Sequence, residues 1–155
     1  MNTRSFFTSA FVAGIVIGFL GNLPVLNFVN CLCCVWAWLG GALAVVLYQR
    51  SQGGQPTPTP GQGAGLGAAA GLVGALVGAV VFVLTSAVSF PLMDDLARNL
   101  EIEGDLPFQT WGVWEAIAMT FFFLLVNGVL YPVFGALGGV IAASLSRAPR
   151  ATGVA

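Results

Sequence analysis

The stretch "GAGLGAAAGLVGALVGAVVFVL", from Gly63 to Leu84, decides the class of fold to which this chain belongs. It contains no charged residue and no proline, and several of its glycines are four residues apart. A helix that crosses a bilayer needs about 20 consecutive apolar residues. Glycines four residues apart share one helix face, where the backbone of a neighbouring helix can approach closely. The stretch therefore predicts a transmembrane helix that packs tightly on other helices.

The rest of the chain has a similar composition. Of its 155 residues, 57% are hydrophobic and 7% are charged, whereas an ordinary globular domain has about 25% charged residues. Three long intervals contain no charged residue, namely 5–49, 51–93 and 116–146. We therefore expect an all-α integral membrane protein, a four-helix transmembrane bundle in which residues 1–155 form a single membrane domain. The expected spans are residues 6–23, 31–48, 66–88 and 113–146.

The segments between the spans differ in character. Residues 49–62 contain Gln, Gly, Pro and Thr without an apolar run, which is typical of a flexible linker. The triplet "SFP", residues 89–91, is expected to end the third span, because proline cannot donate a backbone hydrogen bond. In the charge-rich loop 89–111 that follows, Leu92, Leu96 and Leu100 recur every four residues. That spacing predicts a short external amphipathic helix lying in the interface.

The last apolar run, residues 113–146, is too long for one simple span. It is either one long helix kinked near "NGVLYP" or two short helices. The arginines favour one helix, because four spans place Arg4, Arg50 and Arg147 on the same side of the membrane. By the positive-inside rule that side is the cytoplasm. We therefore expect a protein of the bacterial cytoplasmic membrane with both termini inside.

Glycines at helical spacing predict a helix-packing interface. This interface lies either between helices of one bundle or between this chain and another, which is a second copy or a different protein. There is also a hint of a tandem repeat of two hairpins, because "LGGALAVVLYQR" closes the second span and "LGGVIAASLSRA" closes the fourth. The predicted packing residues are Gly14, Gly18, Gly63, Gly67, Gly71, Gly74, Gly78, Gly135 and Gly139.

All three cysteines, Cys31, Cys33 and Cys34, lie at the expected outer end of the second span. Cys31 and Cys34 form a C-x-x-C motif, and a position at a helix N-terminus favours the thiolate. These are conditions for thiol redox chemistry, but cysteines also serve as small apolar packing residues. No metal site is expected, because three thiols within four residues cannot surround one ion and the chain has no histidine.

Four spans, cytoplasmic termini, the sequence C-L-C-C and an amphipathic segment before the fourth span resemble the DsbB family of quinone-linked disulfide-generating proteins. They are also loosely similar to vitamin K epoxide reductases. The resemblance implies that Cys31 and Cys34 pass electrons to a quinone. The family's second cysteine pair has no counterpart, because residues 89–110 contain no cysteine. The chain is also similar to small four-span bacterial membrane proteins with a cysteine-rich second span, a resemblance that implies no activity.

Four polar side chains lie in or near the apolar runs and are candidate functional groups: Asn22, Asn30, Glu115 and Asn127. An ionisable group within a membrane is a functional hypothesis in itself. The alternative for Glu115 is an acid near a helix N-terminus, stabilised by the helix dipole. The asparagines are expected to hydrogen-bond backbone groups freed at prolines.

The sequence predicts a non-enzymatic structural, assembly or accessory subunit, because it contains no complete catalytic or transport constellation. The alternatives are a DsbB-like thiol-disulfide oxidoreductase that uses Cys31 and Cys34, and a small oligomeric channel or carrier. No cofactor is expected, except a quinone under the oxidoreductase alternative. The expected partners are the lipid bilayer and either further copies of the chain or a larger membrane complex. A net charge of -1 gives no reason to expect nucleic acid.

Overall fold

The computed structural model describes residues 2–22, 35–53, 57–99 and 113–147. Within these ranges the chain forms four helices and no strand, so the expected all-α class is confirmed for the described part of the chain. The helices are α1 (Thr3–Leu20), α3 (Val35–Ser51), α4 (Pro60–Asn99) and α5 (Val113–Arg147).

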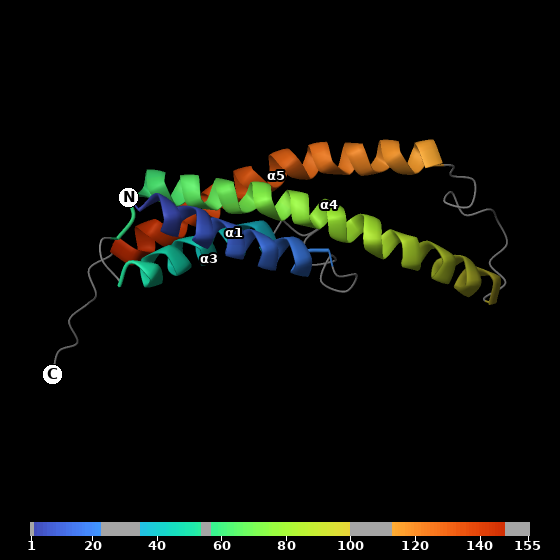
Figure 1. Ribbon diagram of the computed structural model, residues 1–155, viewed down its shortest axis with the longest axis horizontal. Helices are drawn as coiled ribbons and strands as arrows, with labels where there is room; N and C mark the ends of the chain where they lie inside the picture. The colour runs from blue at the N-terminus through green and yellow to red at the C-terminus, as the bar shows by residue number, and fades with distance from the viewer. Residues whose placement is uncertain (1, 23–34, 54–56, 100–112, 148–155) are drawn as a thin grey trace.

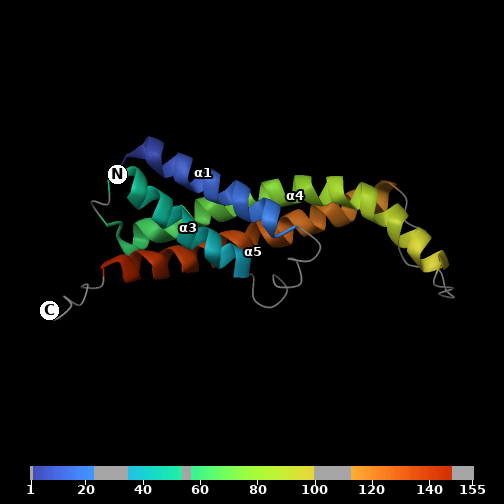
Figure 2. The ribbon, with the colours of Figure 1, turned by 90° about the horizontal axis from the view of Figure 1, so that it is seen from below.

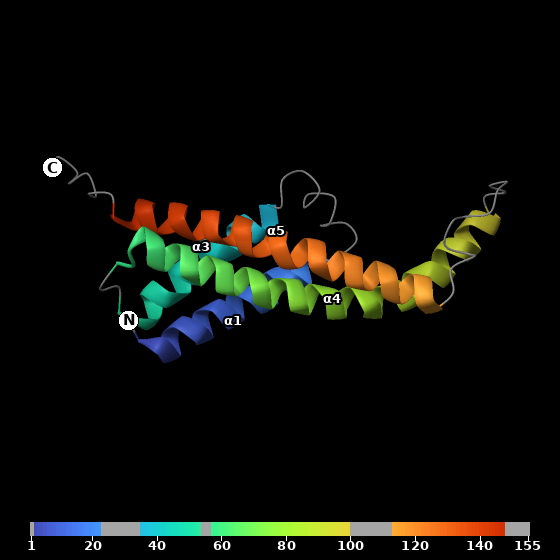
Figure 3. The same ribbon diagram turned by 90° about the horizontal axis from the view of Figure 1, so that it is seen from above.

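Successive helices run in opposite directions, so that the start of α1 and the end of α5 lie at the same end of the molecule (Figure 1). Helices α4 and α5 lie side by side for much of their length and extend well beyond α1 and α3, and their far ends diverge (Figures 1, 2 and 3). We call α1, α3, residues 60–78 of α4 and residues 127–147 of α5 the four-helix part. The projecting hairpin comprises residues 79–99 of α4 and 113–126 of α5.

Three of the helices are long and apolar enough to cross a membrane. These segments are Thr3–Leu20, Pro60–Thr85 and Ile117–Arg147. Helix α3 has 17 described residues, and the first residues of the expected second span, 31–34, lie outside the described ranges. By length and composition, the described residues therefore contain three candidate membrane spans.

Helix α4 differs from the expected third span at both ends. It begins at Pro60 rather than near residue 66, and it continues through Pro91 to Asn99. One proline removes only one backbone hydrogen bond, and the helix continues on both sides of Pro91. The prediction that "SFP" ends the helix is therefore wrong. The residues expected to start a separate amphipathic helix are, as far as Asn99, the last turns of α4, and Leu100 lies outside the described residues.

Helix α5 is one helix of 35 residues with Pro132 inside it, which decides between the two forms left open for the last apolar run. Pro132 lacks the N–H that would bond to the carbonyl four residues earlier, at Gly128, and prolines in helix interiors cause kinks. The axis of α5 changes direction between its orange and red parts (Figure 1).

The described residues at both ends of the expected flexible linker, residues 49–62, are ordered by helices and hydrogen bonds. Helix α3 continues to Ser51, and α4 begins at Pro60 with a capping box. The Thr59 N–H donates to Gln62 Oε1 at 2.9 Å, and the Gln62 N–H donates to Thr59 Oγ1 at 3.2 Å. From α5, Arg147 Nε donates to the carbonyl of Pro58 at 3.1 Å, and Pro58 is fully buried.

The core is built mainly from small side chains. Ala13, Ala44 and Ala70 are fully buried near the end of the bundle that carries the chain start, together with Leu66 and Val45. Helix α1 packs against α4, and α3 packs against α5, so the two sequence hairpins lie side by side. Small core residues bring the helix axes close together, which replaces the hydrophobic drive that is missing between helices in lipid.

Candidate functional site

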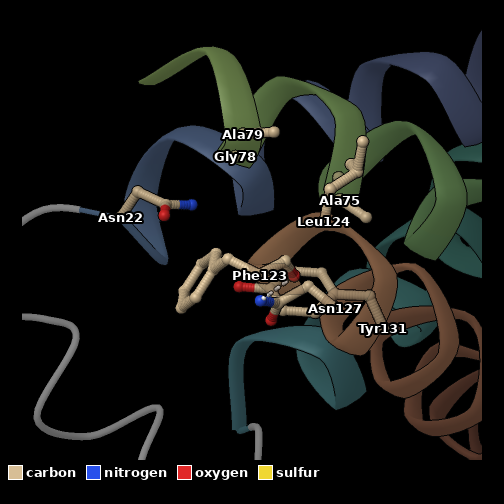
Figure 4. Close-up of a pocket in the computed structure, with 9 residues that line it drawn as sticks. Asn22, Ala75, Gly78, Ala79, Phe123, Leu124, Asn127 and Tyr131 are labelled. Carbon is tan, nitrogen blue, oxygen red and sulfur yellow. Dashed lines mark hydrogen bonds between the residues drawn. The ribbon is translucent and has the colours of Figure 1, made fainter. Parts of the chain in front are cut away.

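A small polar pocket lies where the end of α1 meets α4 and α5 (Figure 4). Asn22, two residues beyond α1, contributes one wall, and Asn127 and Tyr131 of α5 contribute another. The floor is formed by small residues of α4, including Gly74 and Gly78. The structure thus brings together two of the four predicted polar residues, Asn22 and Asn127, from distant parts of the sequence.

Both asparagines hydrogen-bond to the backbone of their own helix. Asn22 Nδ2 donates to the Gly18 carbonyl at 2.8 Å, and Asn127 Nδ2 donates to the Phe123 carbonyl at 2.9 Å. Each amide thereby gives one of its donors to a carbonyl four residues earlier. For Asn127 that carbonyl belongs to Phe123 and not to Gly128, whose carbonyl Pro132 leaves without its helical partner.

The size of the pocket limits what it can hold. Its volume is about 10 Å³, and a cavity needs about 10–15 Å³ by this measure to hold one water molecule. The volume of the pocket is therefore at the lower limit for one water molecule and too small for a substrate. Tyr131 is 3% exposed and its hydroxyl lies beside Gly21, where an added Cβ would be 2.8 Å from the oxygen.

The other predicted polar and thiol residues do not join this pocket. Glu115 is exposed in the first turn of α5, at the far end of the projecting hairpin, where it can interact favourably with the helix dipole. Asn30 and the three cysteines, Cys31, Cys33 and Cys34, lie outside the described residues. Among the residues that are described, no group of three or more His, Cys, Asp or Glu is placed to hold a metal ion.

The predicted glycines of α4 and α5 face each other along the four-helix part. A Cβ at Gly63 would meet the backbone of Gly139, and one at Gly67 would meet the backbone of Gly135. At Gly71 it would lie 2.7 Å from Pro132 Cα. These contacts are between backbones, which cannot move aside as flexible side chains can.

The predicted glycines of α1 face α4. A Cβ at Gly14 would lie 2.5 Å from Val73 Cβ, and one at Gly18 would lie 2.6 Å from the Gly74 carbonyl oxygen. At Gly78 it would lie 2.6 Å from Asn22 Nδ2. All nine predicted glycines therefore contact neighbouring helices within this single chain.

Sequence reasoning missed three further packing glycines, Gly40, Gly41 and Gly138. A Cβ at Gly41 would meet the backbone of Gly135 and Gly139, and one at Gly138 would meet the backbone of Trp38. The signal was present in the two "LGG" sequences, which had been noted only as a repeat. In the structure these two sequences pack against each other, one on α3 and one on α5.

The site and the fold together define a class, which is an all-helical protein with helices apolar and long enough to cross a membrane. Comparison with protein-family models, with curated proteins and with solved structures finds no match to this chain.

Proposed function

We propose that this chain is a non-enzymatic, multi-pass protein of the bacterial cytoplasmic membrane that acts as a structural, assembly or accessory subunit of a membrane complex. The observation that carries the proposal is the projecting hairpin, whose apolar surface the rest of the described chain leaves uncovered.

Helix lengths support this proposal. At the α-helical rise, residues 60–78 of α4 are about 28 Å long, which matches a hydrocarbon core of about 30 Å. Residues 79–99 of the same helix add about 31 Å, and residues 113–126 of α5 are about 21 Å long. A bilayer that covers the four-helix part therefore leaves much of the projecting hairpin beyond its core.

The side chains of the projecting hairpin are not suited to water. On α5, Trp114 is 80% exposed and Phe122 is 61% exposed, and Ile117 and Phe121 are also exposed. Large exposed apolar patches mark protein or membrane contact sites, and beyond the core of the bilayer a protein contact is the one that covers them. A partner helix or a second copy that covers these residues would remove them from water, which is the role expected of an assembly subunit.

The arginines support the orientation in the proposal. Arg4, Arg50 and Arg147 lie at the end of the four-helix part where α1 begins, and the described carboxylates, Asp95 and Glu115, belong to the opposite end. The positive-inside rule then puts the arginines in the cytoplasm. The partner would therefore bind the projecting hairpin on the outer side of the membrane.

Site-specific photo-crosslinking in cells tests the proposal. A photoreactive amino acid at Phe122 should give a discrete protein adduct on gels, because this position faces the partner. The matched control is Leu137, which is 44% exposed on the same helix but within the four-helix part. At Leu137 the probe should react with lipid and leave the protein close to its own mass of 16.0 kDa.

The mass of the adduct identifies the kind of partner. An adduct at twice the chain mass indicates a second copy, and any other discrete mass indicates a different subunit. Absence of protein adducts at Phe122, Trp114 and Phe121 alike would contradict the proposed role as a subunit.

A further inference from the structure

An open apolar groove runs between the outer faces of α1 and α4. Its walls are Phe7 and Phe11 of α1 with Leu72 and Val73 of α4, and Ala10 and Ala69 form its floor. Its volume is about 490 Å³, within the range of about 300–1,000 Å³ that is usual for small-molecule sites. The rims are bulky and exposed, since Phe7 is 63% exposed and Phe11 is 56% exposed.

A cation, Arg4, precedes the groove in α1, although it is not one of the residues that line it. Positions 4, 7, 8 and 11 lie on one face of a helix, so Arg4 lies one turn from Phe7 on the face that forms the groove wall. The Arg4 side chain is exposed, and the carboxylates among the described residues lie at the other end of the molecule. Thr8 adds no free donor to the groove, because its hydroxyl donates to the Arg4 carbonyl at 2.8 Å.

The shape of the groove disfavours a second transmembrane helix as its occupant. Close helix packing in membranes needs a stripe of small residues, and all glycines of α1 and α4 except Gly61 and Gly65 are already packed inside the bundle. Gly14 faces Val73, and Gly71 faces the backbone of Pro132. Bulky rims over a floor of two alanines instead suit a flexible chain that adapts its shape and requires no hydrogen bonds.

We propose that this groove binds one acyl chain of an anionic phospholipid, whose phosphate pairs with Arg4. The site lies at the end of the four-helix part that carries the arginines, so the lipid belongs to the leaflet on that side. This inference goes beyond the role as a subunit and requires only that the chain resides in a bilayer.

Native mass spectrometry of the full chain released from detergent micelles tests the lipid site. Phosphatidylglycerol and phosphatidylcholine with identical acyl chains are the two probes. We expect one phosphatidylglycerol per chain, bound more tightly than phosphatidylcholine. Arg4→Gln should lower the affinity for phosphatidylglycerol about fivefold and leave that for phosphatidylcholine unchanged. Arg50→Gln is the matched control, since Arg50 is also exposed at this end but lies on α3.

A second pair of variants tests the groove itself. Ala69→Phe fills the floor and should abolish retention of both lipids. Leu76→Phe, at a position 61% exposed on the same helix but outside the groove, should leave retention unchanged. Circular dichroism verifies that each variant is folded, and Arg4→Gln tests the proposal even if Ala69→Phe does not fold.

Two results would overturn the proposal. If Arg50→Gln lowers phosphatidylglycerol binding as much as Arg4→Gln does, the lipid is held by overall charge and not at this groove. If Ala69→Phe removes a dimer rather than a lipid, the groove binds a second copy. Either result leaves crosslinking at Phe122 unaffected, so failure of the lipid site and failure of the proposed function can be distinguished.

Discussion

The four-helix part and the projecting hairpin are built largely from the same two helices, but α4 and α5 meet differently in each. In the four-helix part, Gly63 and Gly67 pack against Gly139 and Gly135 at backbone distance. In the projecting hairpin, the contact is between aromatic rings. Phe82 stacks on Phe123 with ring centroids 4.9 Å apart and an interplanar angle of 14°.

Burial changes along α5 in the same way. Gly135, Gly138, Gly139 and Ala143 are buried, whereas none of the described side chains between residues 114 and 130 is buried. Small residues let α3 pack on α5 beside α4, whereas Ile117, Phe121 and Phe122 are exposed without such cover. Residue size therefore decides which half of one helix forms a core and which half remains a surface.

The strongest test of this packing compares two glycines on α5, one that contacts another helix and one that does not. Gly135→Leu should prevent folding or cost more than about 3 kcal/mol, because the new side chain would meet the backbone of Gly67. Gly128→Leu should be neutral or slightly stabilising, since nothing lies within 4 Å of its Cβ position and leucine favours helix more than glycine does. Thermal unfolding in detergent measures both variants, and equal melting temperatures would refute the glycine packing.

A second comparison uses one residue type in both regions. Ile17 is 2% exposed, and Ile17→Ala should cost about 2 kcal/mol through the cavity it leaves. Ile117 is 53% exposed, and Ile117→Ala should change the stability of the single chain by less than about 0.5 kcal/mol. Denaturation in mixed micelles gives both values. A large loss of monomer stability from Ile117→Ala would show that the projecting hairpin has an internal core.

The aromatic stack should contribute less than the glycine contacts. Phe123→Leu should cost about 1 kcal/mol by removing the stack on Phe82, whereas Phe122→Leu, at an exposed position, should cost nearly nothing in the single chain. A double-mutant cycle with Phe82→Leu isolates the pair. A coupling energy of zero would mean that the two helices are not held together by these rings.

The smallest expected effect lies at the start of α4. Thr59→Ala removes one half of the capping box with Gln62 and should cost about 0.5–1 kcal/mol. Thr57→Ala is the control, because Thr57 takes part through its carbonyl, which accepts from Arg147. Hydrogen exchange of the first turn of α4 gives the readout. Equal exchange rates in the two variants would show that the capping box does not hold this turn.

The sequence by itself determined the helical class and the apolar character of the chain. Both follow from local properties, since long runs without charge exclude a water-exposed fold and a bilayer requires helices to satisfy their own backbone hydrogen bonds. The spacing of Gly63, Gly67 and Gly71 likewise reveals a face made for close packing. It does not reveal the neighbour, because a glycine stripe fits any other helix backbone.

Only the tertiary structure decided which helices pack together and how long each helix is. Helix α4 continues through Pro91 to Asn99 because its many backbone hydrogen bonds outweigh the loss of one at the proline. The meeting of Asn22 with Asn127 around a space for one water depends on where the end of α1 lies against α4 and α5. The chain divides into a four-helix part and a projecting hairpin because α1 and α3 are shorter than α4 and α5. The length of each helix and its neighbours are set only when the whole chain packs together.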